Sequence, residues 1–322
     1  MAHSRTRIGA RALIAAVTTA LTLTIAACGS SSDTQSGAGD KVSVNHRRGT
    51  TEITGVPTRI VALGNQWLDA LEILGATPIG YLDNVSIVSG GDVPWEPASL
   101  PKDRAIQPGG DLVEKVAAMN PDLILAPSFL VDQTKFDKLS RLAPTITDLT
   151  AAQVDPWSEQ VKTLGRVLHK EADADKAIAD IYGNIDAVGR KYPGLKGKTF
   201  LTSFLAGPQQ LMVLADAKDG SSELFVRLGM TVPEKLAAQT GAGGRLSLSP
   251  ERVGDLTSDL LVASGNEANY KALPGYADLP SVRKNSVTFL SMGDVTGLNQ
   301  PTPLALPYLL KKLEPALANA AG

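Results

Sequence analysis

A small set of aromatic and polar side chains follows the apolar segments of the chain and could bind a ligand. Aromatic residues make up 5% of the sequence, so those in polar surroundings stand out as flat contact surfaces. Arg245 can donate several hydrogen bonds to ligand oxygens. Burial in the core is the alternative for each aromatic residue, and a solvated loop is the alternative for Arg245. The predicted ligand contacts are Trp67, Tyr81, Trp95, Phe129, Phe204, Arg245 and Asn266.

The sequence lacks the common motifs of enzymes. It has no G-x-S-x-G nucleophile elbow, no Walker A loop and no H-E-x-x-H pair. The glycine-rich segment 241–244 lacks the G-x-G-x-x-G spacing and is predicted to be a turn. Beyond residue 27 the histidines are His46 and His169, which are far apart and expected at the surface. We therefore expect a protein that is not an enzyme, with no cofactor and no directly bound metal.

The N-terminus has the features of a secretory signal. Arg5, Arg7 and Arg11 precede an uncharged apolar run that ends at Cys28, the one cysteine of the chain. The small residues before Cys28 resemble a bacterial lipobox, which predicts a signal peptide over residues 1–27 and a lipid on Cys28. Residues 28–40 are then a Gly/Ser-rich tether at the extracytoplasmic face of the membrane. The alternatives are a transmembrane anchor or a soluble secreted protein.

Composition and charge limit the class of protein further. The chain has 322 residues, 43% of them hydrophobic and 20% charged, which is typical of a globular protein of about two lobes. Without residues 1–27 it keeps 28 basic and 33 acidic residues. This acidic balance argues against nucleic acid as a partner.

Apolar periodicity predicts an α/β protein. Strands are expected at 59–64, 79–82, 123–126 and 145–149, with helices near 68–74, 112–119 and 133–142. Their alternation predicts a parallel sheet, whose ligand-binding residues follow the carboxyl ends of the strands. A long helical pattern over 156–192, broken near 165–170, precedes a second unit from a strand at 198–203 to a helix near 307–317. We predict an N-terminal lobe at 41–155, a linking helical segment at 156–195 and a C-terminal lobe at 196–322.

An internal repeat supports two related lobes. Glu114-Lys-Val, five residues and Asp122-Leu-Ile-Leu-Ala126 recur with the same spacing as Glu251-Arg-Val, five residues and Asp259-Leu-Leu-Val-Ala263. Leu74-Gly-Ala-Thr77 has a counterpart in Leu228-Gly-Met-Thr231. Chance recurrence of common helix-to-strand phrases is the alternative. Two duplicated lobes would leave a ligand cleft between them.

These motifs in order resemble the iron-siderophore substrate-binding family, whose relatives bind haem and vitamin B12. The resemblance extends over about residues 40–318. It is carried by the lipobox and by phrases that begin at Pro57, Leu74, Val116 and Leu279. It implies two Rossmann-like α/β lobes joined by one long rigid helix, with the ligand cleft between them. It also implies a monomer that captures a ferric siderophore and delivers it to an ABC permease and its ATPase.

Further expectations follow from the resemblance. Glu114 and Glu251 match the glutamates that dock onto permease arginines, although each also stands where an acid stabilises a helix start. The segment from Gly90 to Trp95 resembles a loop of hydroxamate binders, and the scarcity of cleft cations also favours a hydroxamate over a catecholate. The alternatives are a haem or cobalamin binder, with a histidine or Tyr81 as haem ligand, and a structural envelope lipoprotein that binds no ligand.

Overall fold

A computed structural model describes residues 40–91, 93–241 and 244–322. The predicted signal peptide, Cys28, the tether up to residue 39 and the centre of the 241–244 turn lie outside these ranges. Among the described residues, no helix is both long enough and apolar enough to cross a bilayer.

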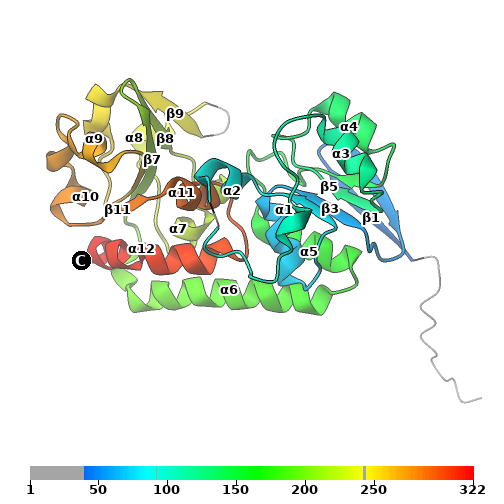
Figure 1. Ribbon diagram of the computed structural model, residues 1–322. Coiled ribbons are helices and arrows are strands. Elements are labelled where there is room, and N and C mark those ends of the chain that lie inside the picture. The colour runs from blue at the N-terminus through cyan, green and yellow to red at the C-terminus, as the bar shows by residue number, and fades with distance from the viewer. Residues whose placement is uncertain (1–39, 92, 242–243) are drawn as a thin grey trace, which may run out of the picture. The chain divides into compact units, whose positions relative to one another are not determined.

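The N-lobe is built on a four-stranded parallel sheet of order β4-β3-β5-β6 (Figure 1). Its strands are β3 Ile60–Leu63, β4 Gly80–Leu82, β5 Leu123–Leu125 and β6 Thr145–Ile146. The helices between them are α1 Asn65–Ile73, α2 Asn84–Ser89, η1 Lys102–Arg104, α3 Leu112–Ala118 and α4 Gln133–Leu139. An antiparallel hairpin, β1 Lys41–His46 and β2 Gly49–Thr54, precedes the sheet. The predicted strands are present, although β6 is shorter than expected.

The C-lobe is built on a five-stranded mixed sheet of order β11-β10-β7-β8-β9. Its strands are β7 Phe200–Gly207, β8 Gln210–Leu214, β9 Arg245–Leu248, β10 Leu260–Ser264 and β11 Val287–Leu290. Strand β8 is antiparallel to both β7 and β9, whereas β7, β10 and β11 are parallel. The sequence did not predict this β7–β8 hairpin.

Short helices complete the C-lobe. They are η3 Gly220–Ser222, α7 Glu223–Arg227, α8 Glu234–Ala237, η4 Pro250–Asp255, α9 Glu267–Lys271, η5 Tyr276–Asp278, α10 Pro280–Arg283, α11 Met292–Asn299 and α12 Ala305–Ala321. The two α/β lobes predicted from the sequence are therefore confirmed.

The 21-residue α6 Glu171–Lys191 is the long helix that joins the lobes, and α5 Trp157–Val167 precedes it and packs on α1 of the N-lobe. The chain turns between them at His169, which has a φ of 54°, so the predicted break is present. Helix α6 ends before η2 Pro193–Leu195 and runs beside α12 (Figure 1). The predicted lobe boundaries at 155 and 195 stay a prediction.

The repeat is visible in the hydrogen bonds of both lobes. The Asp122 carboxylate accepts from the backbone N–H groups of Thr58 and Arg59, each at 2.8 Å, just before β3. The Asp259 carboxylate accepts from the backbone N–H of Thr199 at 3.0 Å, just before β7. Each aspartate thus links the start of the strand that follows it, β5 or β10, to the residues just before the neighbouring strand, β3 or β7.

The two helix ends of the repeat also match. Gly75, after α1, has a φ of 67°, and Gly229, after α7, has a φ of 83°. In both turns the next residue donates its N–H back to the last turn of the helix, from Ala76 to Leu71 and from Met230 to Phe225. This is the Schellman C-cap, which requires a left-handed residue and so favours glycine.

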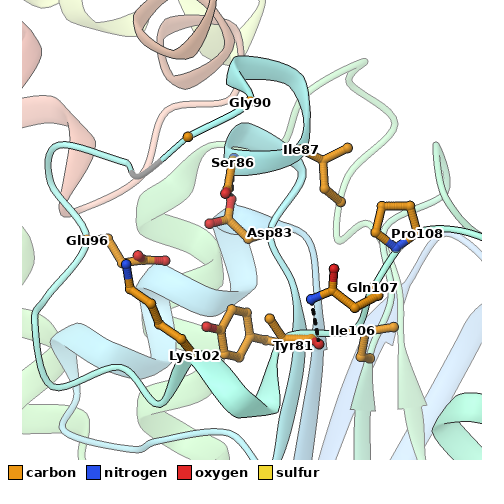
Figure 2. A pocket seen from close by; sticks show the side chains of 12 residues that line it. Tyr81, Asp83, Ser86, Ile87, Gly90, Glu96, Lys102, Ile106, Gln107 and Pro108 are labelled. Carbon is orange, nitrogen blue, oxygen red and sulfur yellow. Dashed lines mark hydrogen bonds between the residues drawn. The ribbon is translucent and has the colours of Figure 1, made fainter.

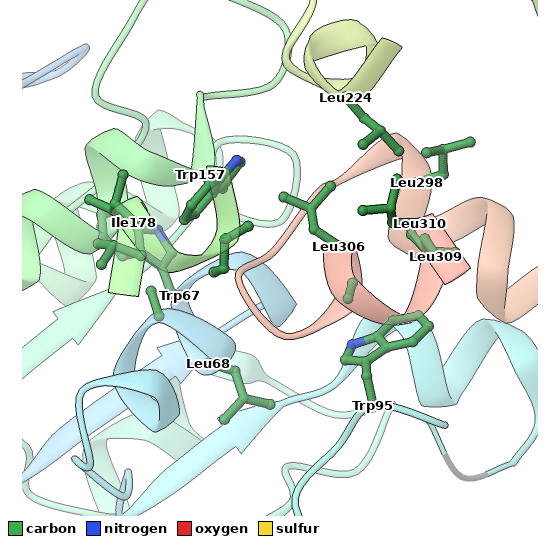
Figure 3. Packing of buried hydrophobic residues seen from close by; sticks show 14 of the residues in the cluster. Trp67, Leu68, Trp95, Trp157, Ile178, Leu224, Leu298, Leu306, Leu309 and Leu310 are labelled. Atoms are coloured by element: carbon green, nitrogen blue, oxygen red, sulfur yellow. The ribbon is translucent and has the colours of Figure 1, made fainter. Parts of the chain in front are cut away.

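A shared hydrophobic core joins the lobes. It includes Trp67 and Trp157 next to the α12 side chains Leu306 and Leu309 (Figure 3). Helix α2 of the N-lobe contacts α11 of the C-lobe. Polar links cross the same junction, since Gln66 Nε2 donates to the Pro301 carbonyl at 3.0 Å.

Candidate functional site

A cavity lies in the N-lobe at the carboxyl end of β4 (Figure 2). Its volume is about 450 Å³. Its lining residues come from the end of β4, from α2 and from the segment 90–108: Tyr81, Asp83, Ser86, Ile87, Gly90, Gly91, Glu96, Lys102, Ala105, Ile106, Gln107 and Pro108. We call it the N-pocket. It stands at the sheet edge where parallel α/β sheets bind ligands.

Tyr81 and Asp83 reach the N-pocket because β4 ends there. The Asp83 side chain caps α2, accepting from the Ser86 N–H at 2.8 Å and from Asn65 Nδ2 at 2.7 Å. Tyr81 is 2% exposed. Burial, together with the negative charges of Glu96 and Asp83, raises the pKa of Tyr81 to about 12. The phenol is therefore neutral at physiological pH.

A second cavity of about 200 Å³ lies in the C-lobe, between the β7–β9 sheet and α11. We call it the C-pocket. Its lining residues are Thr202, Ser203, Phe204, Met212, Val213, Leu214, Arg245, Val295 and Asn299. Because α2 borders the N-pocket and α11 borders the C-pocket, the contact between these helices lies between the two cavities.

Arg245 is held in place at the C-pocket by a buried carboxylate. Its Nη1 lies 2.9 Å from Asp219 Oδ2, and the Asp219 side chain is 1% exposed, against 32% for Arg245. Asp219 also accepts from the Ser221 N–H at 2.9 Å. This pairing orients the guanidinium at the cavity wall, and a guanidinium suits anionic or carbonyl oxygens of a ligand.

The other predicted contacts fall in different places. Phe129 follows β5, is 55% exposed and lies close to Gly64 at the end of β3. Its ring is therefore available at the carboxyl edge of the N-lobe sheet. Asn266 is exposed and caps α9, accepting from the Asn269 N–H at 2.9 Å. This local hydrogen bond accounts for Asn266 without a ligand.

Trp67 does not lie in a loop, and its prediction as a ligand contact is wrong. Helix α1 begins at Asn65, directly after Gly64, and turns Trp67 inward, where it is 0% exposed. It packs near Trp157 and Ile178 in the shared core (Figure 3). The expected core position of Trp157 is confirmed, at 1% exposed.

Trp95 crosses the lobe junction instead of lining either cavity. It is 9% exposed, and its ring centroid lies 5.5 Å from that of Tyr308 on α12. It also fills the space above Gly297 of α11, where an added Cβ would stand 2.5 Å from the indole. The predicted ligand contact is thus a packing contact between the lobes.

Asp69 is a buried acid at the same junction. The Thr302 hydroxyl donates to its Oδ2. Burial raises the pKa of Asp69 to about 8, and Asp83 and Glu96 raise it too, whereas Thr302 and the Trp95 indole lower it. Trp95 Nε1 has no hydrogen-bond partner of ordinary geometry. Burial and the Thr302 hydrogen bond are therefore the main determinants of the pKa of Asp69.

The predicted docking glutamates are exposed at the starts of short helices. Glu114 lies in the first turn of α3, and Glu251 lies in the first turn of η4. Both segments lead into the strand next to the first strand of the lobe, so they begin at the carboxyl edge of their sheets. Each glutamate is thus exposed at a helix start, and its role in docking stays a prediction.

Histidines do not contribute to the pockets. His46, expected at the surface, is 8% exposed and bonds Thr51 at 2.9 Å. His169 is exposed between α5 and α6. In the described ranges, no three His, Cys, Asp or Glu side chains gather as a metal site.

Sequence reasoning missed several lining residues. Met212 lies on the unpredicted strand β8, and Asn299 lies on α11. Asp219 has no sequence signal that links it to Arg245. Glu96 and Lys102 lie in an irregular segment, where periodicity gives no information.

Comparison with known proteins identifies the family. A family model described as periplasmic binding protein matches residues 60–291. The chain belongs to this family. The resemblance seen in the sequence motifs is confirmed, and a family of binding proteins agrees with the absence of enzyme motifs.

Relatives within this family include two proteins of Bacillus subtilis strain 168. The Fe(3+)-citrate-binding protein YfmC is 24% identical over 281 residues, which cover 82% of this chain and 84% of YfmC. The probable siderophore-binding lipoprotein YfiY is 27% identical over 223 residues, or 66% of this chain and 65% of YfiY.

Solved structures of the family share the fold. A periplasmic solute binding protein of Mycobacterium smegmatis has a TM-score of 0.71 and 26% identity, covering 88% of this chain and 99% of its own. PiaA of Streptococcus pneumoniae, in complex with ferrichrome, has a TM-score of 0.68 and 20% identity, covering 87% of this chain and 99% of its own.

Proposed function

We propose that this protein is the extracytoplasmic substrate-binding component of an ABC importer and captures a ferric siderophore of hydroxamate type. Family membership over most of the chain and the siderophore and ferric-citrate names of its relatives support the class of ligand. The ferrichrome complex of a structural neighbour supports the hydroxamate type.

The charge balance of the two pockets is the observation that carries the ligand type. Among the described residues that line them, the cations are Lys102 and Arg245, and the acids are Asp83 and Glu96. A ferric catecholate is strongly anionic and needs several cations, whereas a ferric hydroxamate is nearer neutral. These linings therefore suit a hydroxamate, with Arg245 as donor to its oxygens and Phe129 and Phe204 as flat contacts.

The proposal extends to how the protein works in the cell. Cys28 would carry the lipid that tethers the protein, as a monomer, outside the membrane. Glu114 and Glu251 would dock on the permease, which works with its ATPase. The rigid junction around α12 supports delivery of the ligand by two lobes that stay packed together.

A ligand titration tests the proposed function. The chain from residue 29 onward is titrated with ferric hydroxamates, ferric catecholates, haem and cobalamin, and binding is followed by tryptophan fluorescence and thermal stability. We expect saturable quenching by hydroxamates, because Trp95 lies next to a pocket residue. A response to haem or cobalamin alone would favour those ligands, and no response to any would favour a structural lipoprotein.

Arg245→Ala tests the role of the C-pocket. Losing charge-assisted hydrogen bonds worth about 1.5–3 kcal/mol weakens hydroxamate binding roughly 10- to 100-fold. Arg166→Ala is the matched control, because Arg166 is an exposed arginine on α5 outside both pockets. Equal affinities of the two variants would remove Arg245 from the site.

A further inference from the structure

The Asp83 carboxylate at the N-pocket has an oxygen that is available to a ligand. The Ser86 N–H and Asn65 Nδ2 both donate to Oδ1 of the Asp83 carboxylate. Its Oδ2 accepts no hydrogen bond from the described residues. In Figure 2 the Asp83 side chain points into the space that Glu96 and Lys102 border from the other side.

Tyr81 gives a second, independent sign of a ligand. Its side chain is almost fully buried, yet its hydroxyl has no hydrogen-bond partner among the described residues and points into the same space (Figure 2). Because Tyr81 lines the cavity and its hydroxyl faces the open space, a polar group of a ligand can form a hydrogen bond with it.

The character of that group follows from the surroundings of the hydroxyl. Asp83 and Glu96 outnumber Lys102 in the lining, and Asp103 adds to the negative field at Tyr81. A primary ammonium carries three donors and no acceptor, so it can bond Asp83 Oδ2 and the Tyr81 oxygen together. Ile87, Ile106 and Pro108 form an apolar wall that suits the methylene chain behind such a group.

We propose that the N-pocket binds the alkylammonium end of a linear ferric hydroxamate, held by Asp83, Glu96 and Tyr81. This inference rests on the proposed function and specifies its substrate class. The C-pocket, with Arg245, takes the oxygen-rich part of the ligand. The two pockets thus select a ligand with a cationic arm.

Three ferric trihydroxamates test the inference by calorimetry on the chain from residue 29 onward. Ferrioxamine B is linear and ends in an ammonium, its N-acetyl derivative keeps the chain without the charge, and ferrichrome is cyclic and neutral. We expect ferrioxamine B to bind about tenfold more tightly than the N-acetyl derivative, with a preference that declines as salt is added. Equal affinities would overturn the cationic subsite while leaving the proposed function intact.

Variants locate the preference in the N-pocket. Asp83→Asn with Glu96→Gln should lower the ratio of the two affinities, ferrioxamine B over its N-acetyl derivative, from about tenfold to about twofold. Asp175→Asn is the matched control, because Asp175 is exposed on α6 and lies outside the N-pocket lining, and it should keep the preference. Asp83→Asn retains an acceptor for the α2 cap, and Glu96→Gln alone serves if the double variant does not fold.

Each outcome separates the two proposals. A preference that survives the double variant would move the ammonium site elsewhere and overturn this inference. If none of the three hydroxamates binds while haem or a ferric catecholate does, the proposed function itself fails.

Discussion

At the scale of single residues, Asp69 at the lobe junction should make the stability of the protein depend on pH. Its carboxyl faces Thr302 and the Trp95 indole, with Asp83 and Glu96 nearby, and burial raises its pKa from 3.8 to about 8. The folded protein therefore holds a proton here that the unfolded chain releases above pH 4. The stability that comes from this proton is full below pH 4 and is lost as pH rises toward 8.

Asp69→Asn should remove this pH dependence. The amide keeps an acceptor for Thr302 and cannot ionise, so the variant should gain stability over the native protein as pH rises from 5 to 8. The expected gain is on the order of 1 kcal/mol per pH unit. Urea unfolding at several pH values measures it, and parallel curves for the two proteins would contradict the prediction.

At the scale of elements, helix α11 depends on glycine where Trp95 crosses it. An added Cβ at Gly297 would stand 2.5 Å from the indole ring. Gly297→Ala should therefore overpack the junction and lower the free energy of unfolding by about 1–3 kcal/mol. Chemical denaturation measures the change.

A control and a double variant test whether the contact between the added methyl group and the Trp95 indole causes the loss of stability. Gly183→Ala, in α6, has open space around the new methyl and should stabilise the helix by about 0.5–1 kcal/mol. Trp95→Phe makes room above α11, so it should relieve part of the Gly297→Ala effect. Additive effects of the two junction changes would show that they do not meet.

At the scale of the whole molecule, the proposed docking on the permease uses one exposed acid from each lobe. Glu114→Lys with Glu251→Lys should leave ligand affinity within about twofold and reduce ligand uptake at least about tenfold, because like charges would face the permease. Glu234→Lys reverses a similar exposed acid at the start of α8 and should keep uptake. Normal uptake by the double variant would exclude docking through these glutamates.

The sequence by itself determined the features that depend on local order and spacing. The α/β class, the two related lobes and the break between α5 and α6 follow from periodicity, helix-ending glycines and a repeat of fixed spacing. Tyr81, Phe129 and Phe204 are predicted because ligands bind near the carboxyl ends of parallel strands, and Arg245 because it follows a glycine-rich turn. These signals are patterns of residue type and spacing along the chain. The sequence therefore shows them without any knowledge of three-dimensional contacts.

Only the tertiary structure decided which side chains face a cavity. Trp67 lies in the core because α1 begins two residues before it. The residue at which a helix begins sets the direction in which each of its side chains points. Trp95 packs between the lobes because Gly297, which is far away in sequence and has no side chain, leaves room for the indole ring. Asp219 meets Arg245 only because β8 and β9 pair. Such contacts depend on distant segments, and no local pattern encodes them.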